Sequence, residues 1–150
     1  MTDAPSNIHA TAIVVGKTGL LFLGPSGWGK SMLAFTCIAE AQRMNISSML
    51  VADDQVLISR RGEDVIARCP PTIAGLIELR GTGIVRVPHI DEARMHYAVL
   101  PGNVTGEDRV PPANERSVIA EGIDLPVVRL LATAPLPLAV LMAALPDIGR

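Results

Sequence analysis

Residues 24–31 of the chain read Gly24-Pro25-Ser26-Gly27-Trp28-Gly29-Lys30-Ser31. This stretch matches the pattern G-x-x-x-x-G-K-[ST], in which glycines let consecutive backbone N–H groups point inward around an anion. An apolar run over residues 20–23 precedes it, and apolar residues at helical spacing follow it over residues 30–44. A strand, a loop and a helix in this order form the context in which the pattern is a phosphate-binding loop, or P-loop.

The residue types of this loop suit a nucleoside triphosphate. A helix that starts near Lys30 presents roughly half a positive charge at its N-terminus. Lys30 would place a cation on the outer phosphates, and the Ser31 hydroxyl could bind Mg²⁺. The loop therefore predicts ATP and Mg²⁺ as ligands. It does not select a reaction, because motor ATPases, metabolite kinases and unusual protein kinases share it.

Composition excludes several classes of protein. The 150 residues, 49% of them hydrophobic, fit one domain over residues 1–150 with a single core. The net charge of −2 comes without a cluster of Lys and Arg, which argues against nucleic-acid binding. The start of the chain lacks the basic and apolar runs of a signal peptide, and prolines interrupt its longest uncharged stretch, residues 130–146. We expect a cytoplasmic protein without a membrane partner, with Cys37 and Cys69 as free thiols.

The apolar patterns predict strands interleaved with helices. Strands are expected over residues 12–16, 20–23, 49–52, 55–59, 65–69 and 125–130, and helices over residues 30–44 and 136–145. In the first helix, Met32, Phe35, Ile38 and Ala39 are expected to share the apolar side. Residues 72–76 read as a short helix or loop, and residues 99–116 as a loop. Many strands close in sequence predict an α/β fold with a mixed sheet.

Two adjacent acids, Asp53 and Asp54, follow the apolar residues 50–52. A carboxylate at the end of a buried strand near a P-loop can bind Mg²⁺ or accept a proton from an incoming hydroxyl group. The alternative is a turn in which the acids cap local backbone groups. Because neighbouring residues of an extended chain point to opposite sides, we expect the two acids to have different roles.

A second glycine-containing segment, residues 78–83 (ELRGTG), holds an acid and an arginine in otherwise apolar surroundings. Such charges need partners, which could be a phosphate and its metal or simply each other. His9 and Arg109 are weaker candidates. His9 could equally be a solvated or capping residue, and Arg109 a surface arginine.

Taken in order, His9, GPSGWGKS (24–31), LVADDQV (50–56) and IELRGTGIVRV (77–87) resemble the catalytic domain of the HPr kinase/phosphorylase family. The resemblance is close over residues 8–87 and loose over residues 122–145. It implies a P-loop fold like that of phosphoenolpyruvate carboxykinase, an α/β protein with a mixed sheet and flanking helices. It also implies a kinase that uses ATP and Mg²⁺ to phosphorylate a serine of a small phosphotransferase-system carrier protein, HPr or its nitrogen-related paralogue. Family members remove the same phosphate by phosphorolysis and assemble as hexamers, so the resemblance implies a homo-oligomer.

The resemblance also implies roles for the phosphate-binding residues. Lys30 and the loop backbone would hold the β- and γ-phosphates, while Ser31 and Glu78 would bind Mg²⁺. The nucleotide-binding residues would be Gly24, Pro25, Ser26, Gly27, Trp28, Gly29, Lys30 and Ser31.

Catalytic roles follow from the same resemblance. Asp54 would be the general base for the incoming serine and the general acid in the reverse direction. His9 corresponds to the family's active-site histidine, and Arg109 to an arginine that steadies phosphoryl charge. The segment used in both reactions would comprise Ile77, Glu78, Leu79, Arg80, Gly81, Thr82, Gly83, Ile84, Val85 and Arg86.

Two departures from the family pattern stand out. The sequence begins almost at His9, so we expect a truncated form without the family's N-terminal domain. Where the family has a basic, glycine-containing loop, residues 131–137 (LATAPLP) contain no cation. An inorganic phosphate there would lack positive partners, and we hypothesise that phosphorolysis is weak or lost while the kinase activity is retained.

Two other functions fit a P-loop: a small-molecule kinase or NTPase, and a nucleotide-sensing module without enzymatic activity. The paired acids and residues 78–83 argue against the first. A sensor needs no general base, so Asp54 argues against the second.

Overall fold

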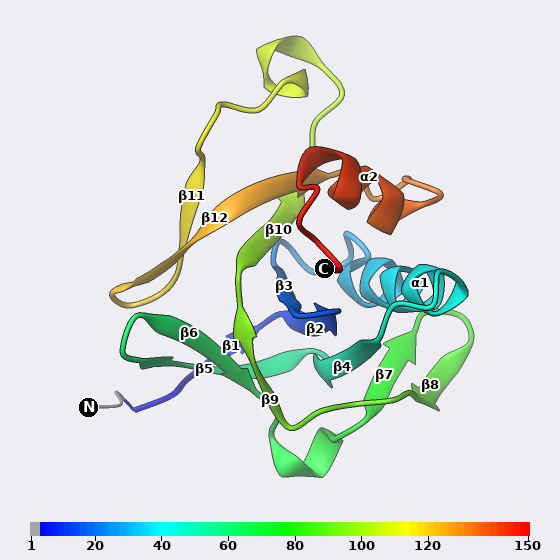
Figure 1. The fold of residues 1–150 in the computed structure, drawn as a ribbon, viewed down its shortest axis with the longest axis vertical. Coiled ribbons are helices and arrows are strands. Elements are labelled where there is room, and N and C mark those ends of the chain that lie inside the picture. The colour runs from blue at the N-terminus through cyan, green and yellow to red at the C-terminus, as the bar shows by residue number, and fades with distance from the viewer. Residues whose placement is uncertain (1–3) are drawn as a thin grey trace.

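The computed structural model describes residues 4–150, apart from the side chains of residues 107 and 108. The P-loop leads from a strand of the main sheet into the longer of the two helices (Figure 1). The strands and helices along the chain are β1 (Ser6–His9), β2 (Thr11–Val15), β3 (Thr18–Phe22), α1 (Lys30–Arg43), β4 (Ser48–Ala52), β5 (Gln55–Arg61), β6 (Asp64–Arg68), β7 (Leu76–Leu79), β8 (Gly83–Arg86), β9 (Glu92–Met95), β10 (Tyr97–Pro101), β11 (Arg116–Ala120), β12 (Ile123–Leu130) and α2 (Pro137–Ala144). Single 3₁₀ turns lie at Pro71–Ile73 and Gly106–Arg109.

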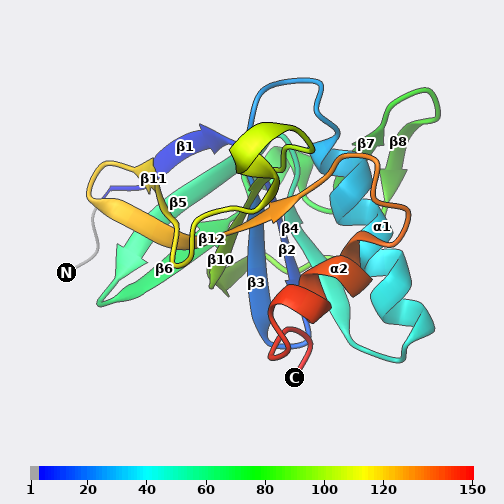
Figure 2. The ribbon, with the colours of Figure 1, turned by 90° about the horizontal axis from the view of Figure 1, so that it is seen from above.

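The main sheet has six strands in the order β11-β12-β10-β3-β2-β4. β10 is parallel to both β3 and β12, whereas β2 is antiparallel to β3 and β4, and β11 is antiparallel to β12. The sheet is therefore mixed, which confirms the prediction. β3, β4, β10 and β12 run in one direction, so their carboxyl ends and the start of β2 meet at one edge of the sheet. The P-loop and the two acids after β4 lie at this edge (Figure 2).

Three layers follow from the alternation of side chains along the strands. Ile13, Val15 and Phe22 face α1 and α2 in one buried cluster. Ala12 and Leu21 face the other way, into a second cluster with the antiparallel four-stranded sheet β1-β5-β6-β9. The six-stranded sheet is thus covered by helices on one face and by the smaller sheet on the other.

Both helices and all six predicted strands are present, with ends shifted by at most a few residues. The predicted apolar side of α1 is partly wrong. Leu33, Ala34 and Cys37 are among the residues that face the core, together with the predicted Ile38, whereas Met32 is 42% exposed. α1 carries apolar residues on nearly every side, so its periodicity alone did not single out the buried face.

Six strands were not predicted: β1, β7, β8, β9, β10 and β11. The predicted loop over residues 99–116 is wrong at both ends, because β10 extends to Pro101 and β11 begins at Arg116. β1, β9 and β11 are edge strands, and edge strands carry polar residues that give no clean alternation. Residues 77–86, for which no strand was predicted, form the β7–β8 hairpin.

α2 is held against α1 by a side chain of α1. The Glu40 carboxylate accepts hydrogen bonds from the backbone N–H groups of Leu138 (2.8 Å) and Ala139 (3.2 Å). A carboxylate at a helix N-terminus is favourable because it satisfies free N–H groups and complements the helix dipole. Leu138 and Leu141 of α2 are fully buried, so the helix is part of the core.

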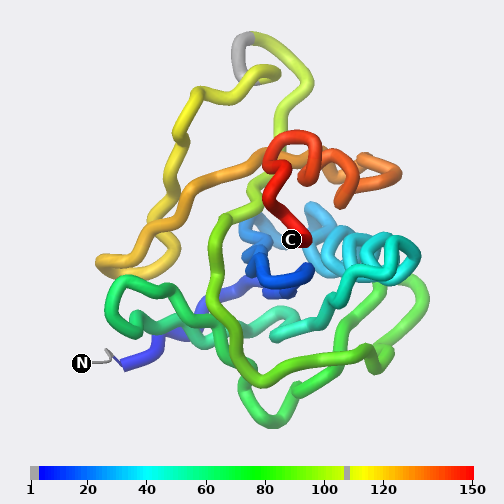
Figure 3. The backbone as a smooth tube through the Cα atoms, in the orientation of Figure 1, coloured from blue at the N-terminus to red at the C-terminus, as the bar shows by residue number. Residues whose placement is uncertain are grey.

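The C-terminal residues return to the turn between β2 and β3 (Figure 3). Ile148 is fully buried in the helix-side cluster. Cys37 and Cys69 are both free thiols, as predicted. Within residues 4–150, neither helix has the length and apolarity that crossing a bilayer requires.

Candidate functional site

The P-loop adopts a backbone conformation that only glycine reaches easily. Gly24 has a φ of 135° and Gly29 a φ of 99°. A Cβ on Gly24 would lie 2.6 Å from the Trp28 Nε1 atom, so both the backbone and the available space require glycine there. Gly29 is the N-cap of α1, and the N–H groups of the first helical turn point into the loop. The turn and the helix start together form an anion cradle.

Lys30 is the first residue of α1 and is 7% exposed. Its ammonium group donates hydrogen bonds to the backbone oxygens of Gly24 (3.2 Å) and Pro25 (3.3 Å), which holds the cation over the loop. Burial lowers the pKa of the Lys30 side chain, and the nearby charges of Asp54 and Asp53 partly offset this by raising it. The amine therefore lies between the loop and both acids.

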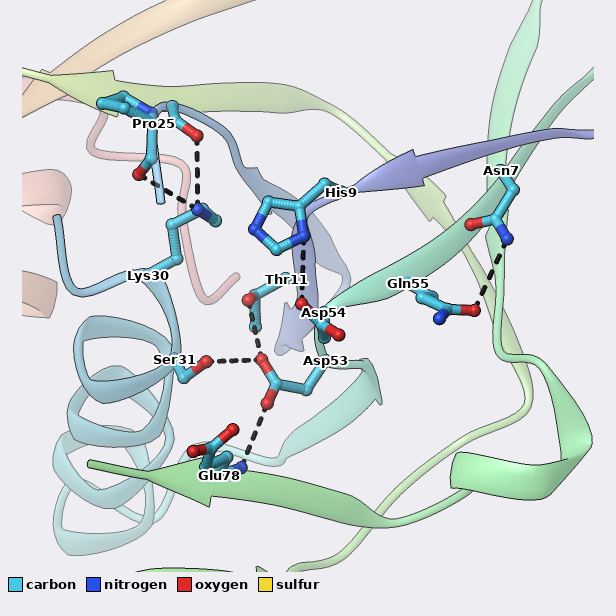
Figure 4. A network of polar contacts seen from close by, with 11 residues as sticks. Asn7, His9, Thr11, Pro25, Lys30, Ser31, Asp53, Asp54, Gln55 and Glu78 are labelled. Atoms are coloured by element: carbon cyan, nitrogen blue, oxygen red, sulfur yellow. Dashed lines mark hydrogen bonds and ion pairs between the residues drawn. The ribbon is translucent and has the colours of Figure 1, made fainter. Parts of the chain in front are cut away.

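Asp53 was predicted together with Asp54 as a candidate for binding Mg²⁺ or accepting a proton, but only Asp54 was given a specific role. Asp53 is the more buried of the two acids. It is 6% exposed, and three elements donate hydrogen bonds to its carboxylate (Figure 4). Oδ1 accepts from the hydroxyls of Ser31 (2.6 Å) and Thr11 (2.9 Å), and Oδ2 accepts from the backbone N–H of Glu78 (3.0 Å). One buried carboxylate thus joins the start of α1, the start of β2 and the β7–β8 hairpin. The feature of the sequence that indicated a functional role for Asp53 was its position, directly after a buried strand and close to a P-loop.

Asp54 faces the opposite way because the chain turns sharply between β4 and β5. Its φ is 71°, in the left-handed region that Asp tolerates better than most residues, and the Gln55 N–H donates to the Asp53 carbonyl oxygen (2.8 Å). The turn directs the Asp54 carboxylate to His9, the last residue of β1. His9 Nδ1 lies 3.0 Å from Asp54 Oδ1. Since a carboxylate offers only acceptors, the hydrogen of this bond belongs to the imidazole.

A cleft of about 580 Å³ connects these groups. Its lining includes His9, Lys30, Ser31, Asp54, Glu78 and Arg80. The Asp54 side chain is 65% exposed and the His9 side chain 51% exposed, so a macromolecular substrate could reach both. Arg80 Nη1 lies 4.0 Å from the position that a Cβ on Gly27 would take, which puts the guanidinium beside the P-loop.

Several predicted site residues lie away from the cleft. Trp28 does not line it; the ring packs against the helix-side core, and its Nε1 is buried without a partner among the described residues. Of residues 77–86, only Glu78 and Arg80 line the cleft, and Ile84 is 69% exposed on β8. Arg109 is an exposed residue of the 3₁₀ turn after β10 and is not part of the lining.

The cleft has the groups that a nucleoside triphosphate and Mg²⁺ require. The helix start and Lys30 suit phosphates, and Ser31 and Glu78 offer oxygen ligands. Among the described residues, no group of three His, Cys, Asp or Glu side chains could enclose a metal ion. A Mg²⁺ would therefore take most of its ligands from phosphate and water, as this ion does in kinase and ATPase sites.

Comparison with known proteins points to one family. The HPr Serine kinase C-terminal domain family matches residues 3–93. An HPr kinase/phosphorylase of Chromobacterium violaceum is 37% identical over 81 residues, which are 53% of this chain and 24% of the relative. Another, from Cupriavidus pinatubonensis, is 31% identical over 146 residues, which are 91% of this chain and 43% of the relative.

A solved structure extends the match to the fold. The HPr(Ser) kinase/phosphatase from Coxiella burnetii superposes with a TM-score of 0.72 at 25% sequence identity, over 90% of this chain and 91% of that chain. The mixed α/β fold is therefore the P-loop fold of this family, as the sequence predicted. The chain spans less than half the length of the curated relatives it matches. With more than half of its residues matched by the family description and its fold shared, the chain belongs to the HPr serine kinase C-terminal domain family.

Proposed function

We propose that the chain transfers the γ-phosphoryl group of ATP to a serine of a small carrier protein, HPr or its nitrogen-related paralogue. The observation that carries this proposal is the position of Asp54. Its exposed carboxylate is held by His9 at 3.0 Å and lies in the same cleft as Lys30 and Ser31. A base beside a phosphate cradle and open to solvent suits an acceptor hydroxyl on another protein.

The phosphate side of the reaction rests on the P-loop. Lys30 and the N–H groups of the α1 N-terminus would bind the outer phosphates of ATP. Ser31 and Glu78 would hold Mg²⁺, and the ion would supply positive charge against the charge that develops on the phosphates. The Ser31 hydroxyl donates its hydrogen bond to Asp53, which leaves lone pairs of the serine oxygen directed away from Asp53. Asp53 is therefore a positioning residue for both proposed metal ligands.

The acceptor side rests on Asp54. The His9 hydrogen bond is made to Oδ1 of Asp54, so Oδ2 would be the oxygen that accepts the proton of an incoming hydroxyl group. As the bond from the serine oxygen to the γ-phosphorus forms, the bond from that phosphorus to the β,γ-bridging oxygen breaks and ADP leaves. The serine proton moves to Asp54. In the reverse direction the same carboxyl group returns the proton to the serine oxygen.

Transfer of label from γ-labelled ATP to purified carrier proteins tests this proposal. We expect Mg²⁺-dependent labelling of one serine on one carrier, at a rate above about 1 s⁻¹, which is ordinary for kinases. Binding of ATP without labelling of either carrier would favour the sensing module instead. Labelling of a small metabolite in a cell extract, with the carriers unlabelled, would favour the small-molecule kinase.

We further propose that phosphorolysis is weak in this chain. In that reaction an oxygen of inorganic phosphate attacks the phosphoserine phosphorus, the serine oxygen leaves with a proton from Asp54, and pyrophosphate forms. Residues 131–137 contribute Ala132, Ala134 and Pro135 to the cleft lining and no cation. An attacking phosphate that binds against this segment would thus gain no positive partner from it to offset the repulsion between two anions.

We expect pyrophosphate release from phosphorylated carrier and phosphate to be at least about tenfold slower than forward transfer, since a lost charge-assisted contact is worth roughly 1.5–3 kcal/mol. Ala132→Lys, which adds a cation to the lining, is expected to speed this release. Thr133→Lys is the matched control, because Thr133 does not line the cleft. Equal forward and reverse rates in the unaltered chain would refute the proposal.

A further inference from the structure

A second cavity lies on the outer face of the smaller sheet β1-β5-β6-β9, on the side turned away from the helices (Figure 1). It has a volume of about 310 Å³, which suits a small organic molecule. It shares no described residue with the cleft at the P-loop. The side chains of the sheet that line it are Leu57, Ser59, Arg61, Ile66, Arg68 and Glu92.

The floor of this cavity is apolar. Val56, Ile58 and Ala67 are buried in the cluster between the two sheets. Because side chains alternate along a strand, Leu57 and Ile66 point the other way, onto the outer face. Ile66 is nevertheless only 7% exposed. The outer face therefore contains a partly covered apolar patch.

An ion pair passes over this patch. Arg61 Nη1 donates to Glu92 Oε2 at 2.8 Å. Arg61 is the last residue of β5 and Glu92 is the first residue of β9, and β6 lies between these two strands with Ile66 at its centre. The pair therefore spans β6 across its centre and forms one wall of the cavity.

Arg68 and Glu92 are direct cross-strand neighbours on β6 and β9, but they do not form an ion pair with each other. Glu92 directs Oε2 to Arg61 instead, and Arg68 has no ion pair or side-chain hydrogen bond among the described residues. Paired residues of antiparallel strands have Cα atoms about 4.5–5.5 Å apart. A cation and an anion thus lie side by side at the cavity, and both have hydrogen-bonding capacity left for a ligand.

The charged residues on this face leave one positive charge over. Arg61 pairs with Glu92, and Arg94 pairs with Asp64 at 3.2 Å, so the unmatched cation is Arg68. A guanidinium group takes a carboxylate through two parallel hydrogen bonds. A phosphate dianion fits less well, because the neighbouring Glu92 repels a second negative charge. The unused partner at this cavity is therefore one for a carboxylate.

The pair Arg68 and Glu92 above an apolar floor matches the groups of an α-amino acid. Such a molecule carries a carboxylate and an ammonium group on one carbon atom, so the two charges lie a few ångströms apart. The guanidinium and the acid on neighbouring strands are spaced to meet both groups at once. Leu57 and Ile66 then lie where the side chain of the amino acid would extend.

We propose that this cavity binds a free α-amino acid with an apolar side chain. Arg68 holds the α-carboxylate, Glu92 Oε1 accepts a hydrogen bond from the α-ammonium group, and Leu57 and Ile66 pack on the side chain. The inference goes beyond the proposed kinase function and does not depend on it, because the cavity and the P-loop cleft have no described residue in common.

Saturation-transfer NMR of the full chain, titrated with L-leucine, tests the site. We expect a Kd on the order of 1 mM, because the charged side chains are solvent-exposed and such pairs bind weakly. 3-Methylbutanoate keeps the carboxylate and the branched chain but lacks the ammonium group, and 3-methylbutylamine lacks the carboxylate. Each is expected to bind at least about fivefold more weakly than leucine, since each loses one charged contact.

Two variants locate the binding. Arg68→Gln should lower leucine affinity about fivefold or more, because it removes the partner of the carboxylate. Arg94→Gln is the matched control: Arg94 is an exposed arginine of the same sheet that does not line the cavity, and its replacement should leave leucine affinity unchanged. Ser59→Leu should fill the cavity and lower the affinity more than about tenfold. If Ser59→Leu fails to fold, Arg68→Gln at an exposed position still decides the question.

Three outcomes would overturn the proposal. Leucine produces no saturation transfer at concentrations up to about 20 mM, which is well above the expected Kd. Alternatively, 3-methylbutanoate binds as tightly as leucine, which would make this a site for simple carboxylates. In the third outcome, Arg68→Gln leaves leucine affinity intact and instead raises the KM for the carrier protein, which would assign this face to the carrier.

Discussion

Replacement of Asp54 by Asn is expected to lower the rate of phosphoryl transfer by about 100-fold to 10,000-fold, the range that a positioned general base contributes. Asparagine keeps the shape of the side chain and can still accept the His9 hydrogen bond, but it cannot take the serine proton. ATP affinity should change little, because Asp54 is an exposed residue outside the P-loop. Single-turnover transfer from γ-labelled ATP to the carrier, measured beside calorimetric ATP titration, separates the two effects.

Asp91→Asn is the matched control for this experiment. Asp91 is also an exposed aspartate, and it does not line the cleft. It should leave both transfer and ATP binding unchanged. Undiminished labelling of the carrier serine by Asp54→Asn would show that another group takes the proton, and the assignment of the base would be wrong.

Replacement of Asp53 by Asn is expected to reduce both stability and the use of Mg²⁺. The amide has one acceptor oxygen, so it cannot satisfy the hydroxyls of Ser31 and Thr11 on one side and the Glu78 N–H on the other. A buried donor without a partner costs about 1–3 kcal/mol, and the free energy of unfolding should fall by roughly that amount. Loss of the link between Ser31 and Glu78 should also raise the Mg²⁺ concentration needed for half-maximal transfer by about tenfold or more.

Urea unfolding and a Mg²⁺ titration of transfer measure these two effects of Asp53→Asn. Thr11→Val supplies the comparison, because it removes one donor to Asp53 and leaves the Ser31 and Glu78 bonds in place. It should cost only about 0.5–1.5 kcal/mol and shift the Mg²⁺ requirement much less. An unaltered Mg²⁺ requirement in Asp53→Asn would argue against a positioning role for this carboxylate.

Asp53 and Asp54 show which features of the site the order of residues can predict. Their adjacency predicted opposite directions and different roles, since successive side chains of an extended chain alternate. It could not say which acid turns inward. That choice is made by the turn at Asp54, with its φ of 71°, and by the arrival of Thr11, Ser31 and Glu78 from three separate elements around Asp53.

The order of the amino acids is enough to predict the P-loop, the helix that follows it and the mixed α/β class. These depend on local requirements: glycine backbone at fixed positions, one lysine at a helix start, and apolar runs too close together for a purely parallel sheet. Contacts in the folded molecule settle which face of α1 is buried, that β1, β9 and β11 are strands, and that Ala132, Ala134 and Pro135 line the same cleft as His9. Each of these is set by partners far away in the chain, and a contact between distant residues leaves no pattern in the residues on either side of it.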